Sequence, residues 1–319
     1  ARGGSLSGIY QRDAGGSISQ ITGLGANPRP TELTVFRNYV YFAATTLAHG
    51  RELWRTDGVS TTRMTDIRPL GGDSNPVLLT PSRNRLAFVA RHPLRGRELF
   101  TIGVASSPRV ESSFAVDPEI SSLTADPGSS STAFWFAASV PSVGGELFRL
   151  PTSGGVALVH DVHSGSQNAD PVHLTPISGG LLFRARSALE GEELRHTDGT
   201  TLRLVKDIKT GNRRTRPKSG FASVLSPLGS SRFLFAAEAN DVGSELWITD
   251  GTTAGTTQVV PGAGMDLSPV LPSQSVGLSL TGGALSGLAI EVWDAPTNQG
   301  GWAFLSAVVP STPLAVPTV

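Results

Sequence analysis

The stretch Glu245-Leu-Trp-Ile-Thr-Asp-Gly-Thr-Thr-Ala-Gly-Thr256 decides the fold, because weaker copies of it recur along the whole chain. Each copy has a glutamate followed by an apolar residue, and these glutamates lie 46, 48, 47, 52 and 46 residues apart. A more eroded copy, Ser7-Gly-Ile-Tyr10, precedes them. A fixed period of this length is the sign of a repeat architecture. The repeated glutamates are Glu52, Glu98, Glu146, Glu193, Glu245 and Glu291.

Each period contains four short runs with strand composition, which we name A to D in chain order. In the first complete period they are Thr31–Phe36, Tyr39–Ala44, the motif around Glu52, and Thr62–Ile67. Aromatic and β-branched residues bounded by Gly, Pro, Asn and Asp indicate strands, and no stretch shows the 3.6-residue apolar period of a helix. Four strands in each repeat predict an all-β fold, a β-propeller of four-stranded blades.

The two ends of the chain suggest how such a ring closes. The first copy contains only runs C and D, at Gly8–Asp13 and Ser17–Ile21, and six sets of four runs follow. We therefore predict seven blades, with the N- and C-terminal segments together closing one blade. Six blades plus an N-terminal cap is the alternative. Residues 1–309 then form a single propeller, and the Pro-rich tail, residues 310–319, is a closing strand or a linker.

Three copies keep the sequence Thr-Asp-Gly between runs C and D, at Asp57, Asp198 and Asp250. An Asp side chain accepts hydrogen bonds from nearby amides and Gly tolerates positive φ, so this sequence predicts a tight hairpin turn. Calcium is the one ion that we weigh at these aspartates, but no cluster of carboxylates accompanies them. We therefore expect a structural turn, no metal site and no cofactor.

The other repeated residues admit two interpretations. As architectural groups, the glutamates would accept backbone amides from their own or a neighbouring blade. Alternatively, six glutamates form a ring of ligand sites, as in sugar-binding propellers. Residues that repeat in every blade are more often architectural, which we favour. The aromatic residues of run C, which include Trp54, Trp247 and Trp293, are expected to pack between blades.

The pattern Glu-Leu-Trp-x-x-Asp-Gly-Thr-x-x-Gly-Thr resembles the ELWxxDGT repeat family. The copy at Glu245 matches at every defined position, and the copy at Glu52 keeps Glu, Leu, Trp, Asp and Gly. Three other copies lack the Asp-Gly pair, and the copy at Glu193 has Arg195 in place of the aromatic residue. The resemblance covers nearly the whole chain. It implies a large secreted or surface protein with propeller-like arrays, and it does not imply an enzyme.

Composition excludes several classes of protein. The chain has 26 Lys and Arg against 26 Asp and Glu, and such a balance argues against a nucleic-acid binder. It has no cysteine, which excludes disulfides and thiolate metal sites. No apolar run is long enough to insert into a membrane. We expect an extracellular or cell-surface protein whose partners are other protein subunits or surface glycans.

The connections that break the repeat are where we expect a specific ligand. The D–A and B–C connections share one face of a propeller, which we call the loop face. One D–A connection is basic, and the B–C connections of two adjacent blades carry further cations. The basic D–A connection would grip an acidic polysaccharide or a phosphate, and the B–C cations would form a positive patch facing one side, unless both are simply solvated loops. These residues are Arg213, Arg214, Arg216 and Lys218 in the D–A connection, and His49, Arg51, His92, Arg95 and Arg97 in the B–C connections.

The sequence leans away from an enzyme. It contains no nucleophile elbow, zinc-protease helix or P-loop, and full repetition argues against catalysis, which normally uses one asymmetric set of groups. We predict a non-catalytic extracellular β-propeller that acts as a binding or assembly module, with self-assembly through its tail. The alternatives are a glycan-binding, lectin-like propeller and a polysaccharide-acting hydrolase or lyase, whose paired carboxylates would be hard to recognise.

Overall fold

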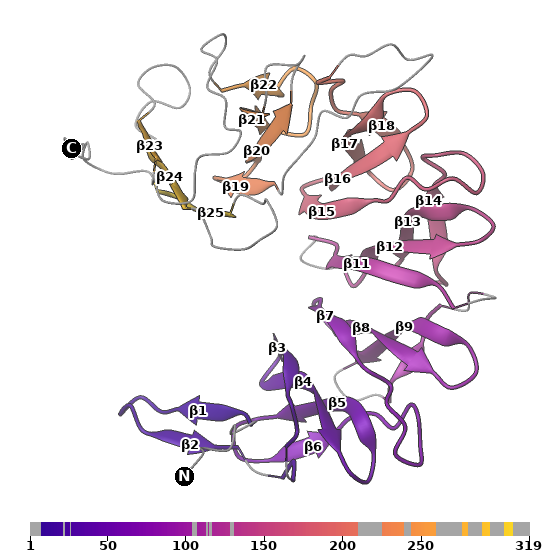
Figure 1. The fold of residues 1–319 in the computed structure, drawn as a ribbon, viewed down its shortest axis with the longest axis vertical. Helices are drawn as coiled ribbons and strands as arrows, with labels where there is room; N and C mark the ends of the chain where they lie inside the picture. Colours follow the sequence, from indigo (N-terminus) through magenta and orange to yellow (C-terminus); the bar gives the residue numbers. More distant parts are fainter. Residues whose placement is uncertain are drawn as a thin grey trace. The chain divides into compact units, whose positions relative to one another are not determined.

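The computed structural model describes residues 8–21, 23–25, 27–103, 107–112, 114, 117–127, 131–209, 225–238, 244–259, 276–279, 289–293 and 303–308. Within these ranges the chain forms strands and turns and no helix, so the all-β prediction is confirmed. The described strands make one two-stranded hairpin, five four-stranded sheets and one three-stranded sheet. We number the larger sheets 1 to 6 along the chain (Figure 1).

The first strands form the hairpin and sheets 1 to 3. The hairpin pairs β1 (Tyr10–Arg12) with β2 (Ile18–Gln20). Each of the three sheets is an antiparallel meander in which neighbours in sequence are neighbours in space. Sheet 1 consists of β3 (Thr31–Phe36), β4 (Tyr39–Thr46), β5 (Gly50–Thr56) and β6 (Thr61–Arg63). Sheet 2 consists of β7 (Val77–Pro81), β8 (Arg85–His92), β9 (Gly96–Gly103) and β10 (Arg109–Val110). Sheet 3 consists of β11 (Glu119–Ala125), β12 (Phe134–Val140), β13 (Gly144–Leu150) and β14 (Ala157–His160).

Sheets 4 to 6 follow in the same order. Sheet 4 consists of β15 (Val172–Ile177), β16 (Gly180–Ser187), β17 (Gly191–Thr197) and β18 (Leu202–Leu204). Sheet 5 consists of β19 (Ser226–Leu228), β20 (Arg232–Glu238), β21 (Ser244–Thr249) and β22 (Thr257–Gln258). Sheet 6 has three described strands, β23 (Val276–Ser279), β24 (Ala289–Trp293) and β25 (Ala303–Val308). The glutamate motif occupies the third strand of each four-stranded sheet, as run C of a propeller blade does.

Contacts divide the chain into two compact units. The first comprises residues 1–187 and 196–202, and the second comprises residues 188–195 and 203–319. In the first unit the A strands β3, β7 and β11 are linked from sheet to sheet. Thr34 Oγ1 lies 3.5 Å from the carbonyl oxygen of Leu79, and Thr80 Oγ1 lies 3.5 Å from that of Leu123. Sheets joined through their first strands are what a β-propeller requires.

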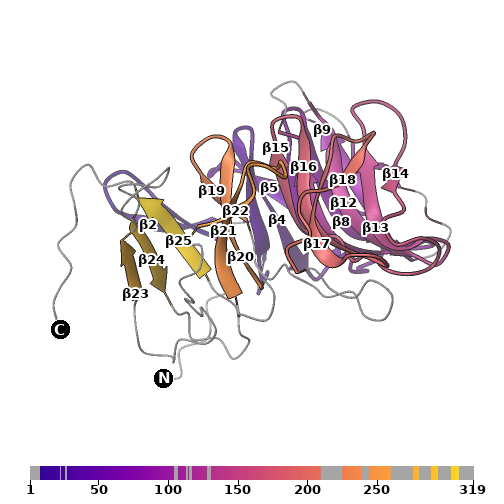
Figure 2. The same ribbon diagram turned by 90° about the horizontal axis from the view of Figure 1, so that it is seen from above.

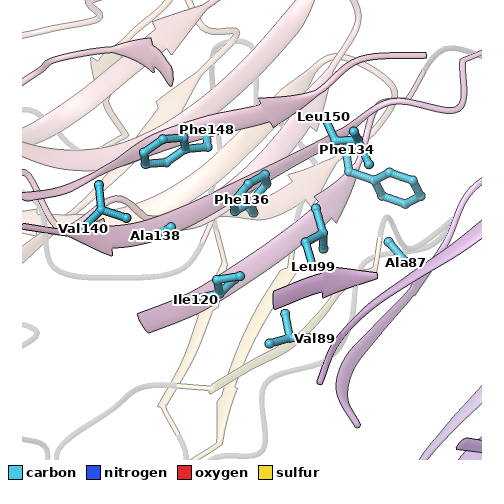
Figure 3. Packing of buried hydrophobic residues seen from close by; sticks show 10 residues of the cluster. All are labelled: Ala87, Val89, Leu99, Ile120, Phe134, Phe136, Ala138, Val140, Phe148 and Leu150. Atoms are coloured by element: carbon cyan, nitrogen blue, oxygen red, sulfur yellow. The ribbon is translucent and has the colours of Figure 1, made fainter. Parts of the chain in front are cut away.

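The motif fills the space between successive sheets of the first unit, because neighbouring residues of a strand point to opposite faces. Leu99 packs toward sheet 3, in a cluster with Phe136 and Phe148 (Figure 3). Phe100, the next residue, packs toward sheet 1 and stacks on Phe88 at 5.5 Å between ring centroids. Phe148 likewise faces back toward sheet 2, so each sheet contributes its leucine forward and its aromatic residue backward. The sheets therefore lie face to face, as Figure 2 shows from above.

The D strands are shorter than the sequence predicts. The run Thr62–Ile67 was expected to be a strand, but β6 ends at Arg63. The amides of Met64 and Thr65 both donate to the carbonyl of Leu53, at 2.8 and 3.3 Å, which turns the chain out of the ladder. The same strand composition predicts runs D over Val156–Val162 and Leu202–Ile208, and the structure shortens these to β14 and β18.

The N-terminal hairpin packs on sheet 1. Ile9 and Ile21 are buried with Phe42 and Trp54 in one apolar cluster. The Pro-rich tail, residues 310–319, lies outside the described residues.

Candidate functional site

The repeated glutamate is buried and holds the start of the D–A connection. Glu146 is fully buried, and its two carboxylate oxygens accept the amides of Val162 and His163 at 3.0 and 3.1 Å. In the second unit Glu193 accepts the amides of Ile208 and Lys209, both at 3.3 Å. A carboxylate that receives two amides from its own sheet is an architectural group.

Glu52 and Glu98 each accept a side-chain hydroxyl, and Glu52 also accepts the amide of Arg68 at 3.2 Å. The Thr65 hydroxyl donates to Glu52 and the Ser112 hydroxyl donates to Glu98, each at 2.5 Å. Burial raises the pKa of Glu98, and it raises the pKa of Glu146 to about 7. These contacts support the architectural interpretation and leave these four glutamates no open face toward a ligand. The side chains of Glu245, Glu291 and Trp293 lie outside the described residues.

The Thr-Asp-Gly sequences form the turns between strands C and D. Asp57 Oδ1 accepts the amides of Val59 and Ser60 at 2.9 and 2.7 Å. Asp198 repeats this with Thr200 and Thr201, and hydrogen bonds from Thr201 and Thr200 lower its pKa to about 2. Asp250 accepts the amide of Thr252 at 2.8 Å. Each aspartate is thus engaged by its own turn.

The B–C turns and the D–A connections meet on one face in sheets 1 to 3. Each B–C turn has three residues followed by a glycine with positive φ, which is a common hairpin geometry. A Cβ on Gly144 would lie 2.1 Å from the carbonyl oxygen of Gln167, so the connection passes directly over the glycine. Asn168 then accepts the amide of Gly145 at 2.8 Å.

Asp73 and Asp117 make the equivalent bonds in the two preceding sheets. They accept the amides of Arg51 and Arg97 at 2.6 and 2.5 Å. Sequence reasoning missed this group. Its signal was an Asp or Asn shortly before the proline that precedes run A, as in Asp73 and Pro76.

The candidate cations of the B–C connections are not all in loops. Only His49 and Arg95 lie in turns, whereas His92 ends β8, and Arg51 and Arg97 are the second residues of β5 and β9. The prediction of five loop residues was wrong there because the strands extend to within three residues of each other.

Arg51 and His49 are also occupied within sheet 1 and its connection. The Arg51 guanidinium donates to the Arg29 carbonyl at 2.8 Å and to Thr31, and the His49 ring lies 4.0 Å from Asp66. Arg95 and Arg97 are exposed. The structure therefore brings no compact cationic site together from these five residues. The candidates Arg213, Arg214, Arg216 and Lys218 lie outside the described residues.

A hydroxyl–imidazole pair lies between sheets 3 and 4. His160 Nε2 is 2.9 Å from Thr197 Oγ1, and burial lowers the pKa of His160. Thr197 is fully buried and its hydroxyl also accepts the amide of Gly199 at 2.9 Å. A substrate cannot reach this hydroxyl, so the pair is a structural contact between two sheets.

A pocket of about 450 Å³ opens beside this contact, on the opposite end of the sheets from the loop face. The A–B connection of sheet 3 supplies Asp126 and Pro127, and β12 supplies Trp135. Sheet 4 supplies the A–B turn from Ser178 to Gly180 and Asp198 of its C–D turn. This is the one concave site that we develop further, and sequence reasoning had assigned only Asp198 within it, as a turn residue.

Among the residues that the structure describes, no group of three or more His, Cys, Asp or Glu is placed to hold a metal ion. In the same residues no helix has the length and apolarity needed to cross a membrane.

We compared the sequence and the structure with those of known proteins, and only solved structures of similar fold match. No protein-family model matches the chain, and no curated protein matches it significantly. A crystal structure of a puromycin hydrolase mutant complexed with PGG matches with a TM-score of 0.51 and 15% identity, over 90% of this chain and 46% of that chain. A puromycin-hydrolyzing peptidase from Mycobacterium tuberculosis matches with a TM-score of 0.47 and 13% identity, over 90% and 47%. TolB from Acinetobacter baumannii matches with a TM-score of 0.40 and 10% identity, over 78% and 58%.

This chain therefore spans about half the length of the hydrolases that it matches. The expectation of a non-catalytic binding or assembly module is contradicted, because the same fold makes up nearly half of the chain of a hydrolase. Repetition does not argue against catalysis when the reacting groups lie outside the repeated strands. The two carbohydrate alternatives belonged to the same expectation and are set aside with it.

Proposed function

We propose that this chain is the propeller portion of a peptidase-like hydrolase, a scaffold that positions substrate for catalytic groups carried elsewhere in the complete protein. The observation that carries the proposal is the match to puromycin hydrolase, which covers nine-tenths of this chain and less than half of that one. The carboxylates of Glu52, Glu146 and Glu193 accept hydrogen bonds from their own sheet and its connection. These repeated residues therefore stabilise the blades, which is consistent with a scaffold role for the propeller.

The test is hydrolysis of amide substrates by the complete gene product in which this chain occurs. The assay uses puromycin and a panel of aminoacyl and dipeptidyl aminomethylcoumarins. We expect turnover of at least one substrate, and a change in KM when the chain described here is removed or replaced. A complete product that is folded but inert toward the whole panel would overturn the proposal, and so would turnover that is unaffected by removal of the chain.

We also propose a ring of seven blades, in which the N-terminal hairpin is the C–D half of one blade. The hairpin touches sheet 1 as sheet 3 touches sheet 4. A Cβ on Gly58 would lie 2.8 Å from Gln11 Oε1 of β1, and a Cβ on Gly199 would lie 3.2 Å from Arg149 Nη1 of β13. Gln11 and Arg149 occupy the same position of the motif in their own copies. In such a ring the C-terminal segment completes the same blade, so removal of residues 310–319 should lower the urea midpoint of unfolding, as should removal of residues 1–21. An unchanged midpoint after removal of residues 310–319 would favour six blades with an N-terminal cap.

A further inference from the structure

The pocket between sheets 3 and 4 is negatively charged at its rim. Asp126 and Asp198 are the two lining carboxylates. One cation offsets them, since Arg149 Nη2 lies 2.8 Å from Asp126 Oδ2. The Asp126–Arg149 pair is close to neutral, so Asp198 leaves a net negative charge beside the cavity.

Asp198 is a fixed anion rather than a mobile one. Its Oδ1 accepts two amides of its own turn at 2.7 Å, and its Oδ2 accepts the Thr201 hydroxyl at 2.9 Å. Its Oδ1 uses both lone pairs in these bonds, whereas its Oδ2 has a further lone pair that can accept another donor from the solvent side. Because the turn holds the carboxylate in place, a ligand would bind it with little loss of side-chain freedom.

The inner wall of the pocket is apolar and contains an unpartnered donor. Trp135 is 1% exposed and lines the pocket together with Pro127. The Trp135 Nε1–H is buried and has no hydrogen-bond acceptor among the described residues. The Arg149 guanidinium packs over the indole ring, 4.5 Å from its centroid. Trp135 and Pro127 thus give the pocket an apolar wall on the side away from solvent, near the carboxylate of Asp198.

We propose that this pocket binds a small organic ammonium ion, whose charge pairs with Asp198 and whose apolar part lies against Pro127 and Trp135. A metal ion fits less well, because Asp126 is already paired with Arg149 and Asp198 alone supplies too few oxygen ligands for one. An anion is disfavoured by Asp198. The inference concerns this pocket alone and does not depend on the proposed hydrolase function.

The test is a titration of the folded chain, labelled with 15N in its five tryptophan indoles, followed by NMR. The probe is phenethylammonium chloride, and the matched neutral probe is 2-phenylethanol. We expect a saturable shift of the Trp135 indole signal, identified by its loss in Trp135→Phe, and an affinity for the cation at least about tenfold higher than for the alcohol. High salt should weaken the binding of the cation and leave that of the alcohol unchanged.

Two variants test the location without touching the carboxylates. Ser178 is exposed at the rim, and Ser178→Lys would place its own ammonium group in the pocket and abolish binding of the probe. Ser230→Lys makes the same change in the A–B turn of sheet 5 and should leave binding intact. Equal affinity for the cation and the alcohol, no saturable shift, or normal binding by Ser178→Lys would each overturn the proposal. A larger response to calcium chloride than to the amine would replace it with a metal site.

Discussion

The carboxylate of Glu146 in β13 accepts the backbone amide of His163 at 3.1 Å, across 17 positions of sequence. This single contact joins the motif strand to the connection that leads into the next sheet. Because Glu193 makes the same contact with Lys209, the repeated glutamate fixes both the end of strand D and the path toward the next strand A.

Replacement of Glu146 by Gln should destabilise the fold by about 1–3 kcal/mol, since the Gln amide nitrogen would face a backbone N–H in place of an acceptor. Urea unfolding followed by circular dichroism measures this loss. Glu119→Gln is the matched control, because Glu119 is exposed at the start of β11 in the same sheet. Equal stability of the two variants would show that the buried contact contributes nothing.

The stability of the fold should depend on pH in the neutral range. Burial raises the pKa of Glu146 from an ordinary value of 4.5 to about 7, against the opposing effect of the amides of Val162 and His163. The folded state therefore holds this proton more tightly than the unfolded chain. The resulting stabilisation is complete below pH 4.5 and is lost as the pH rises through 7.

The urea midpoint should accordingly fall between about pH 5 and pH 8, and Glu146→Gln should flatten that part of the profile. Asp198 contributes with the opposite sign, because its turn lowers its pKa from 3.8 to about 2. Its stabilisation is present above pH 3.8 and is lost as the pH falls through 2. A midpoint that rises from pH 5 to pH 8 would contradict the raised pKa of Glu146.

Much of the fold was predictable, because strand patterns are local. The period of the motif predicted the order of the strands, and run B was predicted to begin at Tyr39, where β4 begins. The ends of strand D were not predictable from composition. They depend on the glutamate of another strand, which takes the amides of residues such as Val162 away from the ladder.

The pocket was hidden from sequence reasoning for a similar reason. Asp126 and Trp135 belong to one repeat and Asp198 to the next, and Asp126 occurs in the copy that lacks the Asp-Gly turn. A site formed by residues of two different repeats does not appear as a motif with a fixed spacing in the sequence. The functional expectation failed separately, because the repeated residues describe the fold of the blades and carry no information on activity.

Replacement of Gly144 by Ala tests the close approach of the D–A connection. Gly144 has a φ of 74°, and an added Cβ would lie 2.1 Å from the Gln167 carbonyl oxygen. The cost combines left-handed strain with a clash against the backbone, and we expect about 3 kcal/mol or more.

Gly165→Ala is the control for that variant. Gly165 has a φ of 81° in the same connection, but no atom lies within 4 Å of its added Cβ. Strain alone should cost about 1–2 kcal/mol there. Thermal or urea unfolding of the two variants separates the terms, and a smaller loss for Gly144→Ala than for Gly165→Ala would mean that the connection does not lie against the glycine.

Replacement of Leu70 by Asn should stabilise the protein. Leu70 is fully exposed in the D–A connection after sheet 1 and has a φ of 64°, which a leucine rarely adopts. Asn tolerates this conformation, and no buried apolar contact is lost, so we expect a gain of up to about 1 kcal/mol. Leu94→Asn is the control, since Leu94 is 90% exposed and is not among the residues with positive φ, and its stability should change by less than about 0.5 kcal/mol. The two sites are both exposed and differ in that only Leu70 has a positive φ. If both variants unfold at the same urea concentration as the parent chain, the left-handed conformation of Leu70 costs no stability.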